Sequence, residues 1–187
     1  MNNVEWTPEW LAETIKLLRT HGSDTQFIEV KKAHGGYPGS LDATLSSFSN
    51  SSTGGIIICG LDENNDFAPV GVYDPADLEK TLGNKLRRGL KPPNTMESGT
   101  ILYEDAKIFV AAIPPLPPYE RPAYIGGKAY VRSGDGDHEM SRHETDLMVA
   151  QRTRTGFDEE PVEYTSLADL DEGLKTAYLR DVRAKSR

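Results

Sequence analysis

Residues 54–63 read GGIIICGLDE, a short apolar run that follows two glycines and ends at a turn. β-branched side chains favour packed positions in a pleated sheet, so residues 56–61 are predicted to form a fully buried strand. Cys59, the single cysteine of the chain, lies inside this run and is interpreted as a small core residue. Asp62 follows at the carboxyl end. The stretch therefore predicts one buried strand of a sheet, with an acidic residue directly after it.

A second predicted strand, residues 26–31, lies mostly within FIEVKKA at positions 27–33. Because side chains alternate along a strand, Glu29 and Lys31 share one face. If the two strands are neighbours, four candidate catalytic side chains converge: Asp24, Glu29, Lys31 and Asp62. The alternative is a solvent-exposed ion pair of the kind found between neighbouring strands.

The chemistry of this group suggests a metal site in the catalytic interpretation. The candidate metal ligands are the three carboxylates, Asp24, Glu29 and Asp62, because hard oxygen donors suit Mg²⁺ or Mn²⁺. Such a metal would polarise a phosphate and activate water, while Lys31 would stabilise the developing negative charge. This predicts a metal-dependent nuclease as one functional alternative.

The remaining segments predict a mixed architecture. Thr7 and Pro8 open a helix over residues 8–20, and Asp74 and Pro75 open another. Residues 100–104 and 107–113 form a predicted hairpin, residues 123–132 form a second, and SRHE at 141–144 is a capping box. The fold class is therefore α+β, with a mixed, partly antiparallel sheet flanked by helices and a C-terminal helical tail.

Composition changes near residue 152 and suggests the domain organisation. Residues 1–152 form the predicted domain, residues 153–165 an acidic linker, and residues 166–187 a C-terminal helix. The chain stops at AKSR without a cap or a turn residue. We expect this helix to lead into a downstream region in a longer protein.

The chain has 187 residues, of which 37% are hydrophobic and 27% charged, a composition typical of a soluble globular domain. No apolar run approaches the length of a membrane span, and the N-terminus lacks the pattern of a secretory signal. The lone cysteine suits a reducing compartment. We expect a cytoplasmic protein with no membrane partner.

The formal net charge of −8 opposes nucleic-acid binding by the surface as a whole. Basic residues nevertheless cluster locally, and a positive face on an acidic chain is consistent with phosphate contact. The candidate nucleic-acid-binding residues are Lys31, Lys32, Lys85, Arg87, Arg88, Lys91 and Arg132. A mixed, solvated surface is the alternative interpretation.

The segment GGYPGS at residues 35–40 connects a predicted strand to a helix N-terminus. Free backbone amides at such a position suit a phosphate, so the phosphate-loop candidates are Gly35, Gly36, Gly39 and Ser40. A flexible turn is the alternative. The glycine and lysine pattern of a Walker A loop is absent from the chain.

Four segments in order give the chain a family resemblance: DTQFIEVK at 24–31, LSSFSNSSTGG at 45–55, IIICGLDE at 56–63 with Val70-Gly71 beyond it, and AYVRSGDG at 129–136. Together they resemble the Schlafen-type AlbA-like domain. That family is often described as DNA-binding, and an older label calls it a divergent AAA-type ATPase. Asp24, Val30 and the loose SFSNSSTGG run depart from the usual pattern.

The resemblance implies an α+β fold, placed in many bacterial relatives before a winged-helix region of a transcriptional regulator. In some Schlafen proteins the matching carboxylates form a metal-dependent RNase site. ATP binding rests on the family label alone.

Our leading hypothesis is therefore a nucleic-acid-binding domain, for DNA or RNA, that requires no cofactor. The alternatives are a nuclease with Mg²⁺ or Mn²⁺, an interaction module that forms homo-oligomers, and a nucleotide-binding domain.

Overall fold

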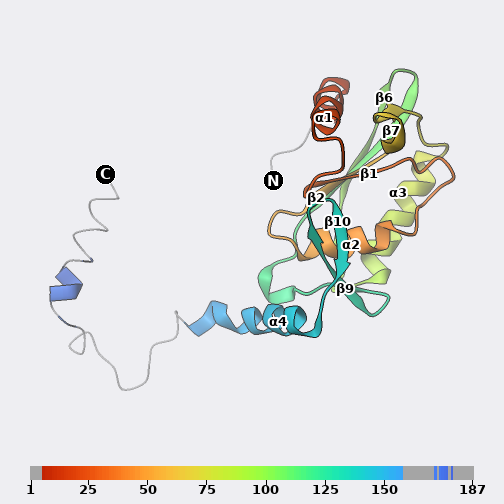
Figure 1. The fold of residues 1–187 in the computed structure, drawn as a ribbon. Helices are drawn as coiled ribbons and strands as arrows, with labels where there is room; N and C mark the ends of the chain where they lie inside the picture. The colour runs from red at the N-terminus through yellow and green to blue at the C-terminus, as the bar shows by residue number, and fades with distance from the viewer. Residues whose placement is uncertain (1–5, 158–170, 172, 177, 179–187) are drawn as a thin grey trace. The chain divides into compact units, whose positions relative to one another are not determined.

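The computed structural model describes residues 6–157, 171, 173–176 and 178 (Figure 1). Contacts divide the chain into two compact units, Met1–Arg152 and Thr153–Arg187. The elements of the fold are α1 (Pro8–His21), β1 (Ile28–Lys31), α2 (Leu41–Asn50), β2 (Gly55–Cys59), β3 (Leu61–Asp62), η1 (Glu63–Asn65), β4 (Ala68–Pro69), α3 (Pro75–Asn84), η2 (Lys85–Gly89), β5 (Leu90–Lys91), β6 (Glu97–Tyr103), β7 (Ala106–Ile113), η3 (Pro118–Glu120), β8 (Tyr124–Ile125), β9 (Lys128–Ser133), β10 (Gly136–Glu139) and α4 (Arg142–Phe157). The predicted linker at 153–165 and the predicted helix at 166–187 lie largely outside the described residues, except that α4 covers positions 153–157.

The first sheet has the strand order β1-β2-β7-β6. β1 and β2 run parallel, with Ile28 opposite Ile56, whereas β7 is antiparallel to both β2 and β6. The predicted strands at 26–31 and 56–61 are therefore neighbours, as the convergence of their side chains requires. Cys59 is fully buried in β2, as predicted.

The second sheet is antiparallel, with the order β10-β9-β8-β5. The predicted hairpin over residues 123–132 is formed by β8 and β9, which Gly126 and Gly127 join, and both glycines have positive φ, 57° and 82°. Glycine reaches these angles without the clash that a Cβ atom causes. A short pair, β3 and β4, completes the strands of the described residues.

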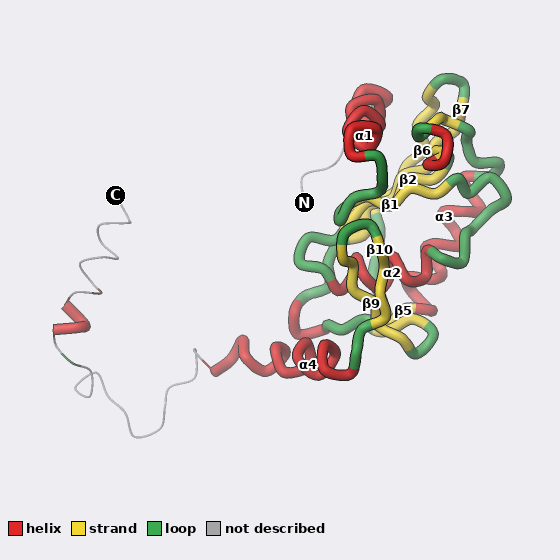
Figure 2. Tube along the Cα trace, viewed as in Figure 1, coloured by secondary structure: helices red, strands yellow, loops and turns green. Residues whose placement is uncertain are grey.

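Helix α2 lies between the two sheets (Figure 2). It is buried at every position from residue 44 to residue 50. Its polar side chains bond the backbone of the second sheet. Ser46 Oγ donates to the Ala123 carbonyl at 2.8 Å and accepts from the Tyr130 amide at 3.0 Å. Asn50 binds the same two residues, at 2.6 Å from the Ala123 amide and 3.0 Å from the Tyr130 carbonyl. Buried polar groups need such partners, so the polar sequence of α2 fits its central place.

Helix α1 covers the other face of the first sheet. Leu11, Ile15 and Leu18 are buried against Ile58 and Val110. The helix begins as predicted, because Thr7 Oγ1 accepts from the Trp10 amide at 3.2 Å. Within the described part of the chain, no helix is both long enough and apolar enough to cross a bilayer.

The predicted starts of α3 and α4 are also confirmed. Asp74 Oδ1 accepts from the Asp77 amide at 3.0 Å at the start of α3. Ser141 and Glu144 form the reciprocal bonds of a capping box, at 2.8 Å and 3.3 Å, at the start of α4. The α+β class, with partly antiparallel sheets flanked by helices and a C-terminal helix, is confirmed.

Candidate functional site

Glu29 is the centre of a buried ion network at the edge of the first sheet. Its side chain is 6% exposed, and its two oxygens bind different cations. Oε1 lies 2.5 Å from Lys31 Nζ, and Oε2 lies 2.6 Å from Arg132 Nη1. Glu29 and Lys31 therefore share a face as predicted, but the glutamate is inside the protein rather than in solvent.

Arg132 on β9 crosses to β1 and holds the two sheets together. Its Nε donates to the Thr25 carbonyl at 3.0 Å, and Nη2 donates to the Ile28 carbonyl at 3.4 Å. Nη1 also binds Asp137 Oδ1 at 3.2 Å, and the guanidinium lies 5.3 Å from the centre of the Phe48 ring. Because this side chain is 2% exposed, its donors point to protein groups rather than to a ligand in solvent.

Asp24 lies beside this network and is buried. Its Oδ1 accepts from the Val30 amide at 3.1 Å, and Oδ2 lies 3.8 Å from Arg132 Nη2. Burial, with the nearby charge of Glu29, raises the pKa of Asp24 to about 7 despite the Val30 hydrogen bond. For Lys31, burial is the largest single influence and lowers the pKa, but the bond to Glu29 together with the negative charges of Glu29, Asp24 and Glu63 raises it overall.

The network closes the free edge of β1. The carbonyls of Phe27 and Lys31 accept from Ile56 and Gly60, so alternate residues of this strand bond toward β2. Ile28 and Val30 between them face away, and their backbone groups bond to the Arg132 and Asp24 side chains. An open strand edge is a template for unwanted pairing, so these side chains protect the sheet.

Asp137 extends the network to α2. Its carboxylate accepts from Thr44 Oγ1 at 2.7 Å and from Ser47 Oγ at 2.5 Å, in addition to Arg132. Sequence reasoning did not find Asp137 or its hydroxyl partners. The available signal was the polar character of the helix at residues 41–50, which implies buried partners once the helix is known to be internal.

The arrangement does not fit a divalent cation. Asp62 pairs with Lys32 at 2.6 Å, and both Glu29 oxygens are taken by cations. Among the residues that the structure describes, no group of three His, Cys, Asp or Glu side chains is placed to hold a metal ion. Asp24 and Glu29 are brought together, but Asp62 belongs to a separate pair.

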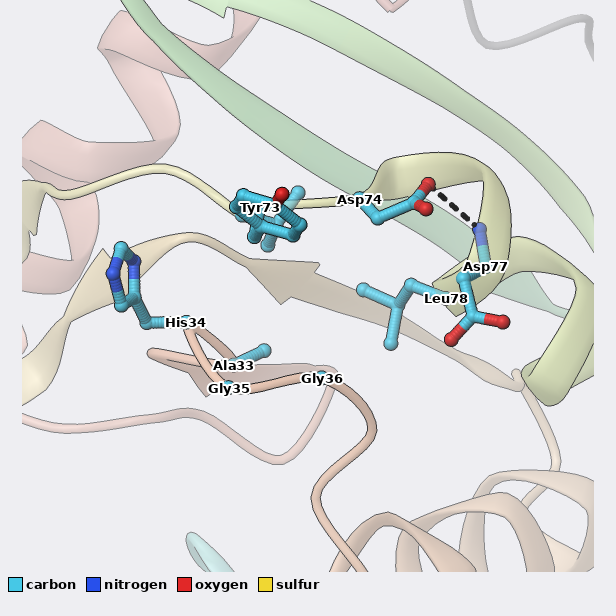
Figure 3. Close-up of a pocket in the computed structure, with 9 residues that line it drawn as sticks. Ala33, His34, Gly35, Gly36, Tyr73, Asp74, Asp77 and Leu78 are labelled. Carbon is cyan, nitrogen blue, oxygen red and sulfur yellow. Dashed lines mark hydrogen bonds between the residues drawn. The ribbon is translucent and has the colours of Figure 1, made fainter.

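The glycine segment borders a hollow of about 340 Å³ (Figure 3). Gly35 and Gly36 line it, whereas Gly39 and Ser40 do not, and its opposite wall carries the carboxylates of Asp74 and Asp77. The first amides of α2 donate to the carbonyls of residues 38–40, so these donors already have partners. Phosphate binding here stays a prediction that these contacts do not favour.

We call η2 and β5 together, residues 85–91, the basic segment. Most of its cations are unpaired among the described residues, unlike Lys31, Lys32 and Arg132. Arg87, Arg88 and Lys91 are exposed, and no ion pair or side-chain hydrogen bond holds them within the described part of the chain. Lys85 instead pairs with Asp42 at 2.7 Å and lies 5.5 Å from the centre of the Tyr37 ring. The segment thus presents three cations to solvent.

These features define a class: an α+β domain in which two four-stranded sheets enclose a polar helix and an arginine joins them. A family model, described as Schlafen, AlbA_2, matches residues 24–141. The chain belongs to this family, and the resemblance found in its sequence is confirmed.

Solved structures show the same fold. One is the solution NMR structure of the N-terminal domain of an ATP-dependent DNA helicase RecG-related protein from Nitrosomonas europaea. It has a TM-score of 0.54 and 23% identity, and covers 70% of this chain and 94% of that one. Another is the crystal structure of the DIP2311 protein from Corynebacterium diphtheriae, with a TM-score of 0.52, 16% identity, and coverage of 88% of this chain and 36% of that one. Curated protein sequences give no match.

Proposed function

We propose that this domain binds nucleic acid through the basic segment. The observation that carries the proposal is the set of three exposed cations without protein partners, Arg87, Arg88 and Lys91. They lie on η2 and β5, which follow α3 and contain the buried Leu86 and Leu90, so their backbone is anchored in the core. Phosphate contacts from such cations supply most of the affinity of non-specific binding.

Two further observations support the proposal. The chain matches the Schlafen, AlbA_2 family over residues 24–141, and that family is often described as DNA-binding. The fold also occurs as the N-terminal domain of a protein related to a DNA helicase. The other predicted nucleic-acid contacts are left out of the proposed interface, because Lys31, Lys32, Lys85 and Arg132 already pair with carboxylates.

The test is the salt dependence of binding to a fluorescent oligonucleotide, measured by anisotropy. We expect weak binding at low salt, because the net charge is −8. Each phosphate contact contributes about 0.7–0.9 to the slope of log affinity against log salt. A triple variant, Arg87→Gln/Arg88→Gln/Lys91→Gln, should therefore reduce that slope by about 2–3.

The matched control removes the same charge elsewhere. Lys16, Lys80 and Lys107 are exposed on α1, α3 and β7, so the variant Lys16→Gln/Lys80→Gln/Lys107→Gln has the same net charge. It should leave the slope nearly unchanged. Equal losses in the two variants would show that general charge, and not the basic segment, controls binding.

The other hypotheses stay predictions. The nuclease hypothesis requires that RNA be cleaved in Mg²⁺ or Mn²⁺ and that Glu29→Gln abolish the cleavage, and the ion pairs of Glu29 and Asp62 do not favour it. A homo-oligomer, ATP binding and a place in a longer transcriptional regulator have no specific observation in their favour.

A further inference from the structure

We propose that the basic segment selects single-stranded nucleic acid, with Tyr124 as the platform on which one base stacks. This inference rests on the proposed function and deepens it. It starts from the pairing of β5 with β8, which places Lys91 directly opposite Tyr124. Cross-strand partners point to the same face, with their Cβ atoms about 5 Å apart. A cation that contacts phosphate therefore has an aromatic ring as its nearest cross-strand neighbour.

The Tyr124 ring is available for such a contact. The residue is half-buried, so part of it is open to solvent. Its hydroxyl makes no hydrogen bond within the part of the chain that the structure describes. Buried tyrosines usually satisfy this hydroxyl with a protein partner. Tyr124 thus has a fixed position in β8, is partly open to solvent, and carries a hydroxyl without a partner among the described residues.

The two arginines lie on the turn that packs against the same strand. A Cβ atom at Gly89 would lie 3.9 Å from Ile125 Cδ1, which shows that the end of η2 contacts β8. Leu90 pairs with Ile125 in the adjoining register position. Arg87 and Arg88 lie two residues and one residue before Gly89, and three to four residues before Lys91, so their charges add to the positive potential around the pair of Lys91 and Tyr124.

Electrostatics restrict what this surface can bind. Lys128, across the β8–β9 hairpin, is paired with Glu139 at 2.6 Å, so it adds no unpaired charge. Three cations on a chain of net charge −8 give a narrow positive area. A duplex offers this surface phosphates only, since its bases are stacked on one another. A single strand also offers base faces, and stacking on an aromatic side chain adds about 1–3 kcal/mol per base.

The experiment compares a labelled 12-mer oligothymidylate with its duplex, and an oligouridylate of the same length, under low salt. We expect single strands to bind about 5- to 150-fold more tightly than the duplex. Stacking does not distinguish ribose from deoxyribose, so the DNA and RNA single strands should bind alike. Tyr124→Leu keeps an apolar side chain for packing and should weaken single-strand binding about 5- to 150-fold. Tyr124→Phe retains the ring and should stay within twofold of the parent.

Tyr73 provides the matched control, because it is 87% exposed beside Asp74 and Asp77 rather than beside cations. Tyr73→Leu should not change binding. A duplex that binds as tightly as the single strand, or an unchanged affinity in Tyr124→Leu, overturns the stacking inference while leaving the proposed function in place. Absence of binding to every oligonucleotide overturns both. The duplex comparison uses the parent protein and does not depend on the folding of any variant.

Discussion

Replacement of Arg132 by methionine tests whether the buried network holds the two sheets together. The change keeps an apolar stem of similar length but removes every donor of the guanidinium. Glu29, 6% exposed, would lose its 2.6 Å partner, and Asp137 would lose its 3.2 Å partner. The carbonyls of Thr25 and Ile28 would lose their donor as well.

Breaking a buried ion pair by removing one partner costs about 3–5 kcal/mol. In this variant Lys31 still pairs with the other Glu29 oxygen at 2.5 Å, so the buried Glu29 charge keeps one of its two cationic partners. We therefore expect Arg132→Met to lower the free energy of unfolding by about 3 kcal/mol. Urea unfolding at pH 7, followed by circular dichroism, measures it.

Two further variants isolate the cause. Glu29→Gln in the Arg132→Met background removes the carboxylate that has lost its arginine. A double-mutant cycle of these two substitutions should show a coupling energy of about 1–3 kcal/mol between Glu29 and Arg132. Arg87→Met, on the basic segment, should change stability by less than about 0.5 kcal/mol but weaken oligonucleotide binding. A loss below about 1 kcal/mol in Arg132→Met would refute the network as the link between the sheets. A loss of oligonucleotide binding at unchanged stability would instead make Arg132 a phosphate contact.

Two other perturbations test the same region and the packing of α2. Because burial raises the pKa of Asp24 from 3.8 to about 7, its contribution to stability is full below pH 3.8 and is lost as the pH rises through 7. Asp24→Asn should remove up to about 4 kcal/mol of the change in the free energy of unfolding between pH 4 and pH 8. The same substitution at exposed Asp105 should leave that pH dependence in place. If the free energy of unfolding varies with pH in the same way in the parent and in Asp24→Asn, the raised pKa of Asp24 is wrong. Gly55→Ala would place a Cβ atom 2.5 Å from the Phe48 ring and should cost about 1–3 kcal/mol in urea unfolding. Gly35→Ala is the control, because a Cβ atom at Gly35 would have no atom within 4 Å and should change the free energy of unfolding little. Equal losses of stability in the two variants would show that the Phe48 ring is not the cause of the loss at Gly55.

Several local features were predictable because they depend on nearby residues alone. The cap at Thr7, the turn at Gly126 and Gly127 and the capping box at residues 141–144 each follow from residues within a few positions of one another. The shared face of Glu29 and Lys31 follows from strand alternation. The neighbouring strands at 26–31 and 56–61 required one assumption about topology, which the parallel pairing confirms.

The candidate site was less predictable, because local pattern does not reveal which surface an element covers. Basic residues at positions 31, 32, 85 and 132 have the composition of phosphate contacts, yet each pairs with a carboxylate. Arg87, Arg88 and Lys91 have the same composition and remain open to solvent. Tertiary packing separates these two groups, because it brings Asp62 to Lys32, Asp42 to Lys85 and Glu29 to Arg132.

By itself, the sequence determined the elements, the α+β class, the family resemblance and the alternation that pairs Glu29 with Lys31. The tertiary structure decided that Glu29 is buried, that Asp62 belongs to Lys32 and that Arg132 joins the sheets. The reason is distance along the chain: Arg132 bonds Thr25 and Ile28 across 107 and 104 positions. Contacts over such separations depend on how sheets and helices pack, and no periodicity within one segment specifies them.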